Sequence, residues 1–372
     1  MSSNPFKLVE IADIHFGNGR VPPALTYSNL SKYLYPQLND CQLLVINGDT
    51  FDTMLNLNSD AGYYVAKFID DVISLAIQHQ FLIRVVRGTF SHDRHQNRFF
   101  LIRGNDQLQL NGQAVVRVFD KLTIEQLQPS GLTFLYCPDN LPYADLNEAV
   151  LELLSVNHLK SVDAVFSHGY FRHLLPENLP HVPADTLDWV KLKSHVKGYV
   201  FNGHVHHCGL HERVICSGSF ERFDHSVVEK VGFWIAKVNG RQWHPEFIEN
   251  PDSLAFKTFY TSLAKSDTEL ADSIREYIEA NYAKGYSKQV PMYIRIVGDD
   301  HGLVKYFKDN YPTIVVTNQV EHRLQITDFD ATVRFEALPT ITEANLVDLI
   351  YPAINDPQLF TKAELKELLD AL

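Results

Sequence analysis

Three histidines fall within four positions of the stretch YVFNGHVHH, residues 199–207, directly after an apolar run that predicts a buried strand. A single histidine at the end of a strand is more often a hydrogen-bonded structural residue than a metal ligand. Imidazoles become informative when carboxylates and further imidazoles end neighbouring strands, because such mixed sets bind divalent transition metals. The question is therefore whether other strands of this chain end in the same way.

Four further apolar runs end in glycine or polar residues, and each predicts a strand: KLVEIADIH, CQLLVINGDTFD, FLIRVVRGTFSHD and AVFSHGY. Between the second and third runs, AGYYVAKFIDDVISLAIQHQ has apolar residues at helical spacing. This alternation predicts an α/β sheet with covering helices. Because the carboxyl ends of neighbouring strands meet at one crevice, we expect a convergence there of carboxylate and imidazole side chains, namely Asp13, His15, Asp49, His92, His168, His204 and His206.

The converging side chains predict a metal site. Each of these residues alone would be interpreted as structural. An ordered set of them at successive strand ends is improbable without a common function. Imidazole mixed with carboxylate suits Mn²⁺, Fe²⁺ or Zn²⁺, and the absence of cysteine from the set argues against a structural zinc site.

Composition limits the class of protein. The chain has 372 residues, a formal net charge of −12 and 45% hydrophobic residues, which predicts a globular protein with a large core and an appended part. No apolar run reaches the length of a membrane span, and the N-terminal stretch lacks a secretory signal. The four cysteines form no CxxC pair, which favours reduced thiols. We therefore expect a cytoplasmic protein with no membrane association.

A domain boundary is expected near residue 245, because the chemistry-bearing residues thin out there and Pro245 and Pro251 follow. A smaller α/β unit is expected over residues 246–335. It contains the alternating strand VPMYIRIVG and a helix in SDTELADSIREYIEANYAK, whose start carries a capping box of Ser266 and Glu269. A helical tail is expected over residues 336–372.

The motifs DIHFG, GDTFD, SHD, SHG and GHVHH, in this order, resemble the five motifs of calcineurin-like metallophosphoesterases. The match covers about residues 1–245 and implies the metallophosphoesterase β-sandwich with flanking helices. The stretch ICSGSFERFDHSVVEKVGFWIAKVNG further resembles SbcD-type nuclease subunits of DNA double-strand-break repair, from a bacterium or a phage. For the rest of the chain, this resemblance implies a small α/β capping domain that binds DNA and a helical C-terminal tail.

The resemblance also assigns the metal ligands. It implies that one ion is held by Asp13, His15 and His206. A second ion would be held by His168 and His204, and Asp49 would bridge the two. Mn²⁺ is expected first, with Mg²⁺, Fe²⁺ or Zn²⁺ as alternatives. Two ions roughly 3.5–4 Å apart can clamp a phosphodiester and acidify a bound water, which explains why so many ligand-type side chains are needed.

Two catalytic roles follow from the same resemblance. His92 would lie over the scissile phosphate, where it stabilises charge or protonates the leaving oxygen. Asp52, three residues after Asp49, would orient the imidazole of His92, and a helix-capping aspartate is the alternative interpretation. Beyond His92, the cationic residues Arg94, His95 and Arg98 lie beside aromatic residues, and they form either a grip on a nucleic-acid backbone or a solvated loop.

The third motif departs from the family pattern. The family usually has an asparagine after the glycine, where it is a ligand of the second ion, but the run here is RGTFSHD. Thr89 follows the glycine and Ser91 precedes His92, and either hydroxyl can coordinate weakly or through water. Ser91 is the substitute ligand we assign, and we expect the second ion to bind loosely.

The expected function is a two-metal DNA phosphodiesterase, an exonuclease or endonuclease acting at DNA ends in repair or recombination. The implied partners are DNA, an SbcC-type ABC ATPase with a long coiled coil, and a second copy of the chain in a homodimer. The tail helices, in TITEANLVDLIYPAI and LFTKAELKELLDAL, would dock on the coiled coil or fold back on the capping domain. Two alternatives remain: a metallophosphoesterase on a small nucleotide or lipid headgroup, and a scaffold that kept the fold without catalysis. The location would be the cytoplasm, or the host cytoplasm for a viral protein.

Overall fold

The chain divides into two compact units, Met1–Glu321 and His322–Leu372. The computed structural model describes residues 5–104, 108–175, 182–183, 185–227, 229–264, 266–299 and 302–319, all in the first unit. The predicted tail over residues 336–372, with its two docking helices, lies outside the described residues. The same is true of residues 320–335 of the predicted capping domain.

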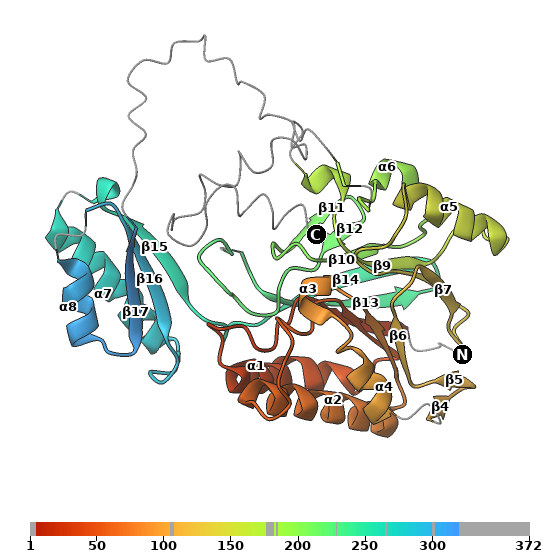
Figure 1. The fold of residues 1–372 in the computed structure, drawn as a ribbon, viewed down its shortest axis with the longest axis horizontal. Coiled ribbons are helices and arrows are strands. Elements are labelled where there is room, and N and C mark those ends of the chain that lie inside the picture. Colours follow the sequence, from red (N-terminus) through yellow and green to blue (C-terminus); the bar gives the residue numbers. More distant parts are fainter. Residues whose placement is uncertain are drawn as a thin grey trace, which may run out of the picture. The chain divides into compact units, whose positions relative to one another are not determined.

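One layer of the fold is a mixed six-stranded sheet with the strand order β14-β13-β1-β2-β3-β6 (Figure 1). Strands β1, β2, β3 and β6 are parallel, and β13 pairs antiparallel with both β1 and β14. Strands β1 to β3 are buried almost throughout, as expected for parallel strands covered on both faces. The bounds are β1 (Phe6–Ile11), β2 (Leu43–Asn47), β3 (Leu82–Val86), β6 (Val116–Phe119), β13 (Gly232–Asn239) and β14 (Gln242–Glu249).

A second six-stranded sheet has the order β11-β12-β10-β9-β8-β7. Its four central strands are parallel, and β7 and β11 are antiparallel edges. Apolar side chains of both sheets meet between them, including Leu43, Phe134 and Phe201. The two sheets therefore form a sandwich. The bounds are β7 (Thr123–Gln126), β8 (Thr133–Cys137), β9 (Ala164–His168), β10 (Val200–Gly203), β11 (Gly209–His211) and β12 (Val214–Cys216).

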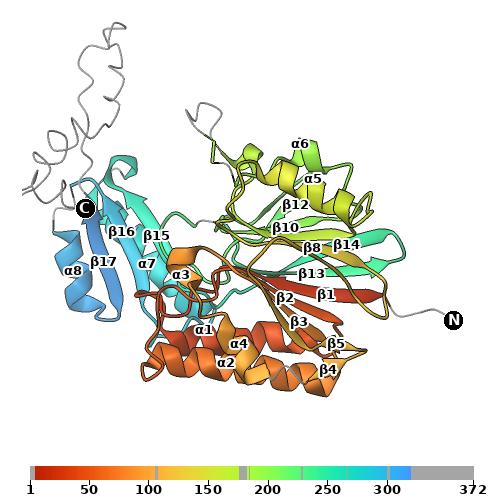
Figure 2. The ribbon, with the colours of Figure 1, turned by 45° about the vertical axis from the view of Figure 1, so that its right-hand side comes forward.

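Helices cover the outer faces of both sheets (Figure 2). The predicted long helix is confirmed as α2 (Asp60–His79), whose side chains Val65, Phe68, Ile69, Val72 and Ile73 are buried. Ser59 caps its first turn by accepting a hydrogen bond from the Gly62 N–H. The other helices and short elements of the sandwich are α1 (Pro23–Asn29), a π-helical turn (Leu30–Leu34), a 3₁₀ turn (Tyr35–Leu38), α3 (Phe90–Asp93), α4 (Arg98–Gly104), β4 (Gln109–Leu110), β5 (Gln113–Ala114), α5 (Leu146–Val156), a 3₁₀ turn (Arg172–Leu174) and α6 (Trp189–Leu192).

A small parallel sheet follows the sandwich, with the order β15-β16-β17. Its strands are β15 (Phe256–Tyr260), β16 (Met292–Val297) and β17 (Ile314–Gln319), and a 3₁₀ turn (Thr261–Leu263) follows β15. Helices α7 (Asp267–Ala283) and α8 (Leu303–Asn310) share its apolar core. Ser266 accepts a hydrogen bond from the Glu269 N–H, as the predicted cap requires.

The predicted architecture is confirmed as an α/β sandwich of two sheets with flanking helices, followed by a small α/β part. Strand β14 runs through the expected boundary at residue 245 and ends at Glu249, with Pro245 on this edge strand. The division at residues 245 and 335 stays a prediction. Among the described helices, none combines the length and apolar character needed to cross a bilayer.

Candidate metal centre

The predicted ligands lie at one end of the sandwich, where the parallel strands of both sheets finish. Asp13 follows β1 and Asp49 follows β2 in the first sheet. In the second sheet, His168 is the last residue of β9 and His204 directly follows β10. The loops after β1 and β2 stay paired, because the Asp13 N–H donates to the Gly48 carbonyl at 3.1 Å. The register of the strands therefore brings these residues to one place.

A first group consists of Asp13, His15 and His206, whose ligand atoms lie within 4.8 Å of one another. The Nε2 atoms of His15 and His206 are 3.1 Å apart. Oδ1 of Asp13 lies 3.5 Å from Nε2 of His206 and 3.8 Å from Nε2 of His15. Three ligand atoms thus face a common centre.

A second group consists of Asp49, His168 and His204, again within 4.8 Å. Oδ2 of Asp49 lies 3.2 Å from Nε2 of His168 and 3.8 Å from Nε2 of His15 in the first group. Asp49 therefore faces both groups, which is the position that the predicted bridging role requires. The bridging role itself remains a prediction.

The backbone around these ligands is strained. Asp13, His15, Asp49 and His204 have positive φ angles of 50°, 51°, 48° and 79°. Such conformations cost about 1–3 kcal/mol each and persist only where the surrounding structure enforces them. Gly48, with a φ of 88°, has to be glycine, because a Cβ atom there would lie 2.0 Å from Nδ1 of His168.

Neighbouring polar groups orient two imidazoles. Nδ1 of His168 is 2.8 Å from the Asn47 carbonyl, so this nitrogen is a donor, and Nε2 is the atom left for a metal ion. The buried Nε2 has no hydrogen-bond partner, although Asp49 is close. For His15, Nδ1 lies 3.2 Å from Oδ1 of Asp52, which leaves Nε2 on the side of the first group. A cation bound by these Nε2 atoms would take the place of their protons.

The prediction that the Asp52 carboxylate orients His92 is wrong. This carboxylate does not face His92. It lies beside His15 and accepts a hydrogen bond from the Asn18 side chain at 3.2 Å. The backbone carbonyl of Asp52 is the group that meets Nδ1 of His92, at 2.5 Å. The reason is a backbone pairing in which the Asp52 N–H donates to the Phe16 carbonyl, so that the side chain is turned toward the loop after β1.

His92 lies beside the first group. Its ring centroid is 4.8 Å from that of His15, in an edge-to-face arrangement. His92 also forms a third candidate cluster with His15 and Asp49. The Asp52 carbonyl accepts from Nδ1, which leaves Nε2 available to a substrate.

Of the two hydroxyls in the third motif, that of Thr89 lies among the candidate ligands, and that of Ser91, which we assigned, does not. Ser91 is exposed on the one-turn helix α3. Oγ1 of Thr89, at the start of this helix, lies 3.1 Å from Oδ2 of Asp49 and 3.2 Å from Nδ1 of His204. The Thr89 N–H also donates to Asp49 at 2.6 Å. Thr89, which precedes the helix, thus lies among the candidate ligands, whereas Ser91 is on the solvent side of the helix.

Two buried aspartates were missed as site residues. Asp93 ends the SHD motif and accepts hydrogen bonds from the N–H groups of Asp49 and Gly88, so it holds the bridging loop. Burial, and then the charge of Asp49, raises the pKa of Asp93. Asp139 follows β8. Burial raises the pKa of its carboxyl, and the charges of His168 and His204 offset this in part. The run TFLYC followed by PDN was the available sequence signal, since it has the same strand-then-aspartate form.

Opposite charges compensate one another inside the centre. Burial favours the neutral form of Asp13, but His15 and His206 lower its pKa well below the usual range. Burial lowers the pKa of His15, yet the neighbouring aspartates outweigh it and raise the pKa to about 9. Burial also lowers the pKa of His168, but the charge of Asp49 outweighs it and raises the pKa to about 10. Without a metal ion the site therefore keeps Asp13 ionised and holds protons on His15 and His168, which a bound cation would displace.

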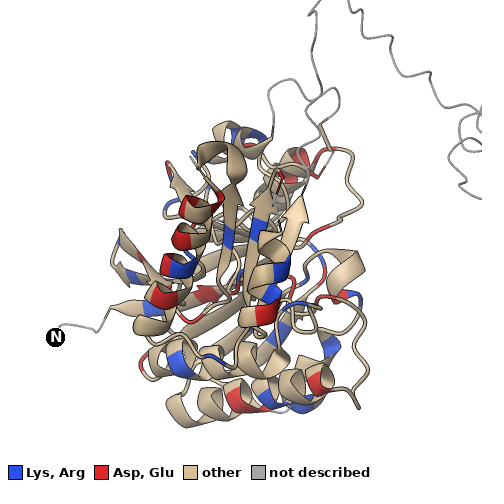
Figure 3. Ribbon diagram, turned by 90° about the vertical axis from the view of Figure 1, so that its left-hand side faces the viewer, with Lys and Arg blue, Asp and Glu red and all other residues tan. Residues whose placement is uncertain are grey.

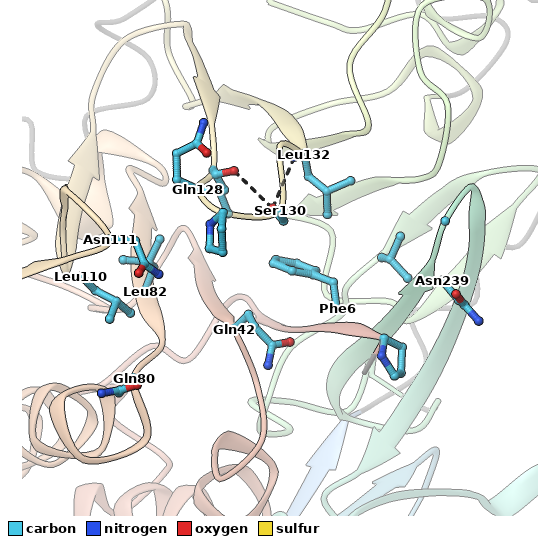
Figure 4. Close-up of a pocket in the computed structure, with 15 residues that line it drawn as sticks. Phe6, Gln42, Gln80, Leu82, Leu110, Asn111, Gln128, Ser130, Leu132 and Asn239 are labelled. Atoms are coloured by element: carbon cyan, nitrogen blue, oxygen red, sulfur yellow. Dashed lines mark hydrogen bonds between the residues drawn. The ribbon is translucent and has the colours of Figure 1, made fainter. Parts of the chain in front are cut away.

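A cavity of about 460 Å³ lies elsewhere, among the starts of β1 and β3 and the loops at residues 110–111 and 127–132 (Figure 4). Apolar side chains such as Phe6 and Leu132 line it, together with the carboxamides of Gln42 and Gln128. None of the lining residues is ionisable, and none belongs to the metal centre. This cavity has no groups for phosphoryl chemistry.

No family model and no curated protein sequence matches the chain. Solved structures with some similarity include GAP50, the anchor in the inner membrane complex of Plasmodium (TM-score 0.39, 14% identity, covering 68% of this chain and 86% of that one). Others are the nuclease MPE of Pseudomonas putida (0.24, 17%, 62% and 84%) and a cold-active protein-tyrosine phosphatase of a psychrophilic Shewanella (0.29, 12%, 66% and 81%). Because these TM-scores are below 0.5, the similarities do not assign a function. We therefore infer the function from the geometry of the centre.

Proposed function

We propose that the chain is a metal-dependent phosphodiesterase that cleaves DNA. The observation that carries this proposal is a pair of ligand groups with Asp49 facing both and His92 beside them. Divalent ions held there would clamp the phosphate oxygens and acidify a water molecule. Mn²⁺ is the ion we propose first, since it accepts imidazole and carboxylate ligands together.

Different residues of the centre would bind the ions and act on the phosphate. Asp13, His15 and His206 would hold one ion, and His168 and His204 the other, with Asp49 between them. His92, oriented by the Asp52 carbonyl, presents Nε2 to the phosphate, where it stabilises charge or protonates the leaving oxygen.

DNA is favoured over a small phosphodiester because a separate α/β unit follows the sandwich, with its own core of residues such as Ile274, Ile294 and Phe307. A small substrate does not need such an addition. Figure 3 shows basic and acidic residues interspersed along the elements, in keeping with the net charge of −12. We therefore propose that the isolated subunit binds DNA weakly, and that preference for ends comes from a homodimer and an SbcC-type coiled-coil ATPase.

The proposal is tested by incubating the protein with Mn²⁺ or Mg²⁺ and end-labelled duplex or single-stranded DNA, beside bis-p-nitrophenyl phosphate. We expect metal-dependent DNA cleavage that EDTA and Asp49→Ala abolish and that Asp120→Ala, an exposed aspartate after β6, leaves unchanged. Turnover of the small ester with intact DNA would favour the small-substrate alternative. Bound metal without turnover of either substrate would favour a scaffold.

The ATPase partnership has its own test. Removal of residues 336–372 should leave Mn²⁺-dependent cleavage of simple DNA substrates intact and abolish co-purification with the ATPase. Loss of folding would support a tail that packs on its own chain, and unchanged complex formation would move the interface elsewhere. Tight, steeply salt-dependent DNA binding by the subunit alone would contradict the weak binding proposed above.

A further inference from the structure

Two exposed aromatic side chains flank the second ligand group. Phe90 directly follows Thr89 and is 48% exposed, and Tyr170 lies two residues after His168 and is 36% exposed. Phe90 begins α3, which follows β3, and Tyr170 follows β9, so the two come from different sheets of the sandwich. A scattered exposed ring needs no explanation, but these two follow strands that also carry the candidate ligands.

A contact places the Tyr170 ring beside His204. The two rings meet edge to face, with centroids 4.5 Å apart. Phe90 directly follows Thr89, whose hydroxyl lies 3.2 Å from Nδ1 of His204. On its outer side, Phe90 contacts the ring of His95 edge to face at 5.7 Å. Both rings therefore keep part of their surface for a ligand while their positions are held by packing.

Unpaired cations lie beside Phe90. Arg94 and Arg98 are exposed, and within the described part of the chain neither forms an ion pair or a side-chain hydrogen bond. Aromatic rings interleaved with cations are the usual means of holding a single nucleic-acid strand, since bases stack on the rings and phosphates meet the cations. A phosphate ester of an aliphatic alcohol would leave both rings without a partner.

We propose that Phe90 and Tyr170 are specificity-determining residues that stack on unpaired bases of the strand being cleaved. The inference rests on the proposed function, and it narrows the substrate from DNA in general to strands whose bases are unpaired at the metal centre. A base within a duplex is stacked and paired, so it has to be displaced before a ring can receive it. Single-stranded DNA and frayed ends are then the preferred substrates.

The test compares a fluorescent oligothymidylate with the same strand in which tetrahydrofuran abasic units replace the central nucleotides. Binding is measured by anisotropy in EDTA, so that no cleavage occurs. Stacking of a base on an aromatic ring corresponds to about a 5- to 150-fold difference in Kd. We expect Tyr170→Ala and Phe90→Ala to weaken binding of the intact strand within this range and of the abasic strand less than twofold.

Matched variants separate the ring from other effects. Tyr170→Phe keeps the ring and should bind as the wild type does. Tyr63→Ala removes a tyrosine that is 59% exposed on α2 and should change nothing. Equal losses on intact and abasic strands would mean that Tyr170 acts only by supporting His204, and would overturn the proposal. A change in oligomeric state on sedimentation with unchanged DNA binding would also overturn it, by making the rings a protein contact.

Failure of this inference is distinguishable from failure of the proposed function. If the wild type cleaves DNA with Mn²⁺ and the ring variants bind both strands as the wild type does, stacking is wrong and the nuclease function stands. If base-dependent binding is found and no metal cleaves the strand, the nuclease function is wrong and the base-binding surface stands.

Discussion

The two halves of the metal centre share Asp49 but differ in the charge of their other ligands. The first half has a carboxylate of its own, Asp13, and a second one, Asp52, beside His15. The second half adds only imidazoles and the neutral hydroxyl of Thr89. A divalent cation is attracted more strongly by an ionised oxygen than by a neutral one, so we expect the first half to bind its ion more tightly.

Burial does not separate the two halves. In each half two ligands are buried, and the third, His206 or His204, is half-buried. Solvent cover is therefore similar on both sides, and ligand charge is what differs. The comparison predicts that the two ions bind in two steps, the first half before the second.

Removal of the shared ligand should have the largest effect. Asp49→Ala takes away the carboxylate that faces both halves, so neither ion should remain bound and cleavage should fall by about 10³-fold or more. Metal content after desalting and the initial rate of DNA cleavage measure the two effects. Retention of one ion at full affinity would show that Asp49 belongs to one half alone.

His92 tests whether the residue between the halves is a ligand or acts on the substrate. His92→Ala should lower the rate of cleavage by about 10²–10⁴-fold while both ions stay bound, because the imidazole acts on the phosphate. Metal analysis of the purified variant is the deciding measurement. An emptied site would show that the cluster of His15, Asp49 and His92 binds a metal ion itself.

Asp52 probes the first half alone. Asp52→Asn keeps the shape but removes the charge beside Nδ1 of His15, and it should lower the affinity for the first ion by about 10- to 100-fold. Calorimetric titration with Mn²⁺ should show this loss in the tighter step only. Asp60→Asn, an exposed residue at the start of α2, serves as control. A loss confined to the weaker step would reverse the assignment of the two halves.

Thr89 probes the second half. Thr89→Val removes the hydroxyl and should weaken the second binding step by about tenfold or less, since a neutral ligand contributes modestly. Thr89→Asn supplies a carboxamide oxygen and should tighten the same step. Ser91→Ala should leave both steps unchanged, because this hydroxyl is exposed on α3. An effect of Ser91→Ala equal to that of Thr89→Val would restore Ser91 as the ligand.

The smallest effect on the metal centre is expected from Glu10, a buried residue behind the second half. Glu10 is fully buried and accepts hydrogen bonds from Asn47 and Ser217, and the Asn47 carbonyl in turn holds His168. Burial outweighs these hydrogen bonds and raises the pKa of Glu10 from 4.5 to about 7. The folded chain therefore binds a proton that the unfolded chain releases, and this stability is complete below pH 4.5 and lost as the pH rises through 7.

The free energy of unfolding of the metal-free wild type should thus contain a decrease between pH 4.5 and 7 that Glu10→Gln removes, by up to about 3 kcal/mol. Urea denaturation at a series of pH values gives the difference between the two proteins. Glu148→Gln, at an exposed position in α5, should reproduce the wild-type slope. Parallel curves for wild type and Glu10→Gln would show that folding does not raise the pKa of Glu10.

The sequence by itself determined the alternation of strands and helices and the candidate ligands. The apolar spacing in α2 and the uninterrupted apolar runs of β1, β2, β3, β9 and β10 are local patterns, so they can be read without knowing what packs against them. The candidate ligands could be named because they lie at or shortly after strand ends, and parallel strands bring their ends together. The short apolar run of β8 escaped this reading, and Asp139 was missed with it.

Only the tertiary structure decided which way the loop side chains point. Whether Thr89 or Ser91 faces the ligands depends on where the single turn of α3 begins, and no repeat in the sequence marks that residue. Whether Asp52 serves His15 or His92 depends on a hydrogen bond to Phe16, 36 positions earlier in the chain. Loop geometry is set by such long-range pairings and by strained φ angles, and neither leaves a periodic signal in the order of amino acids.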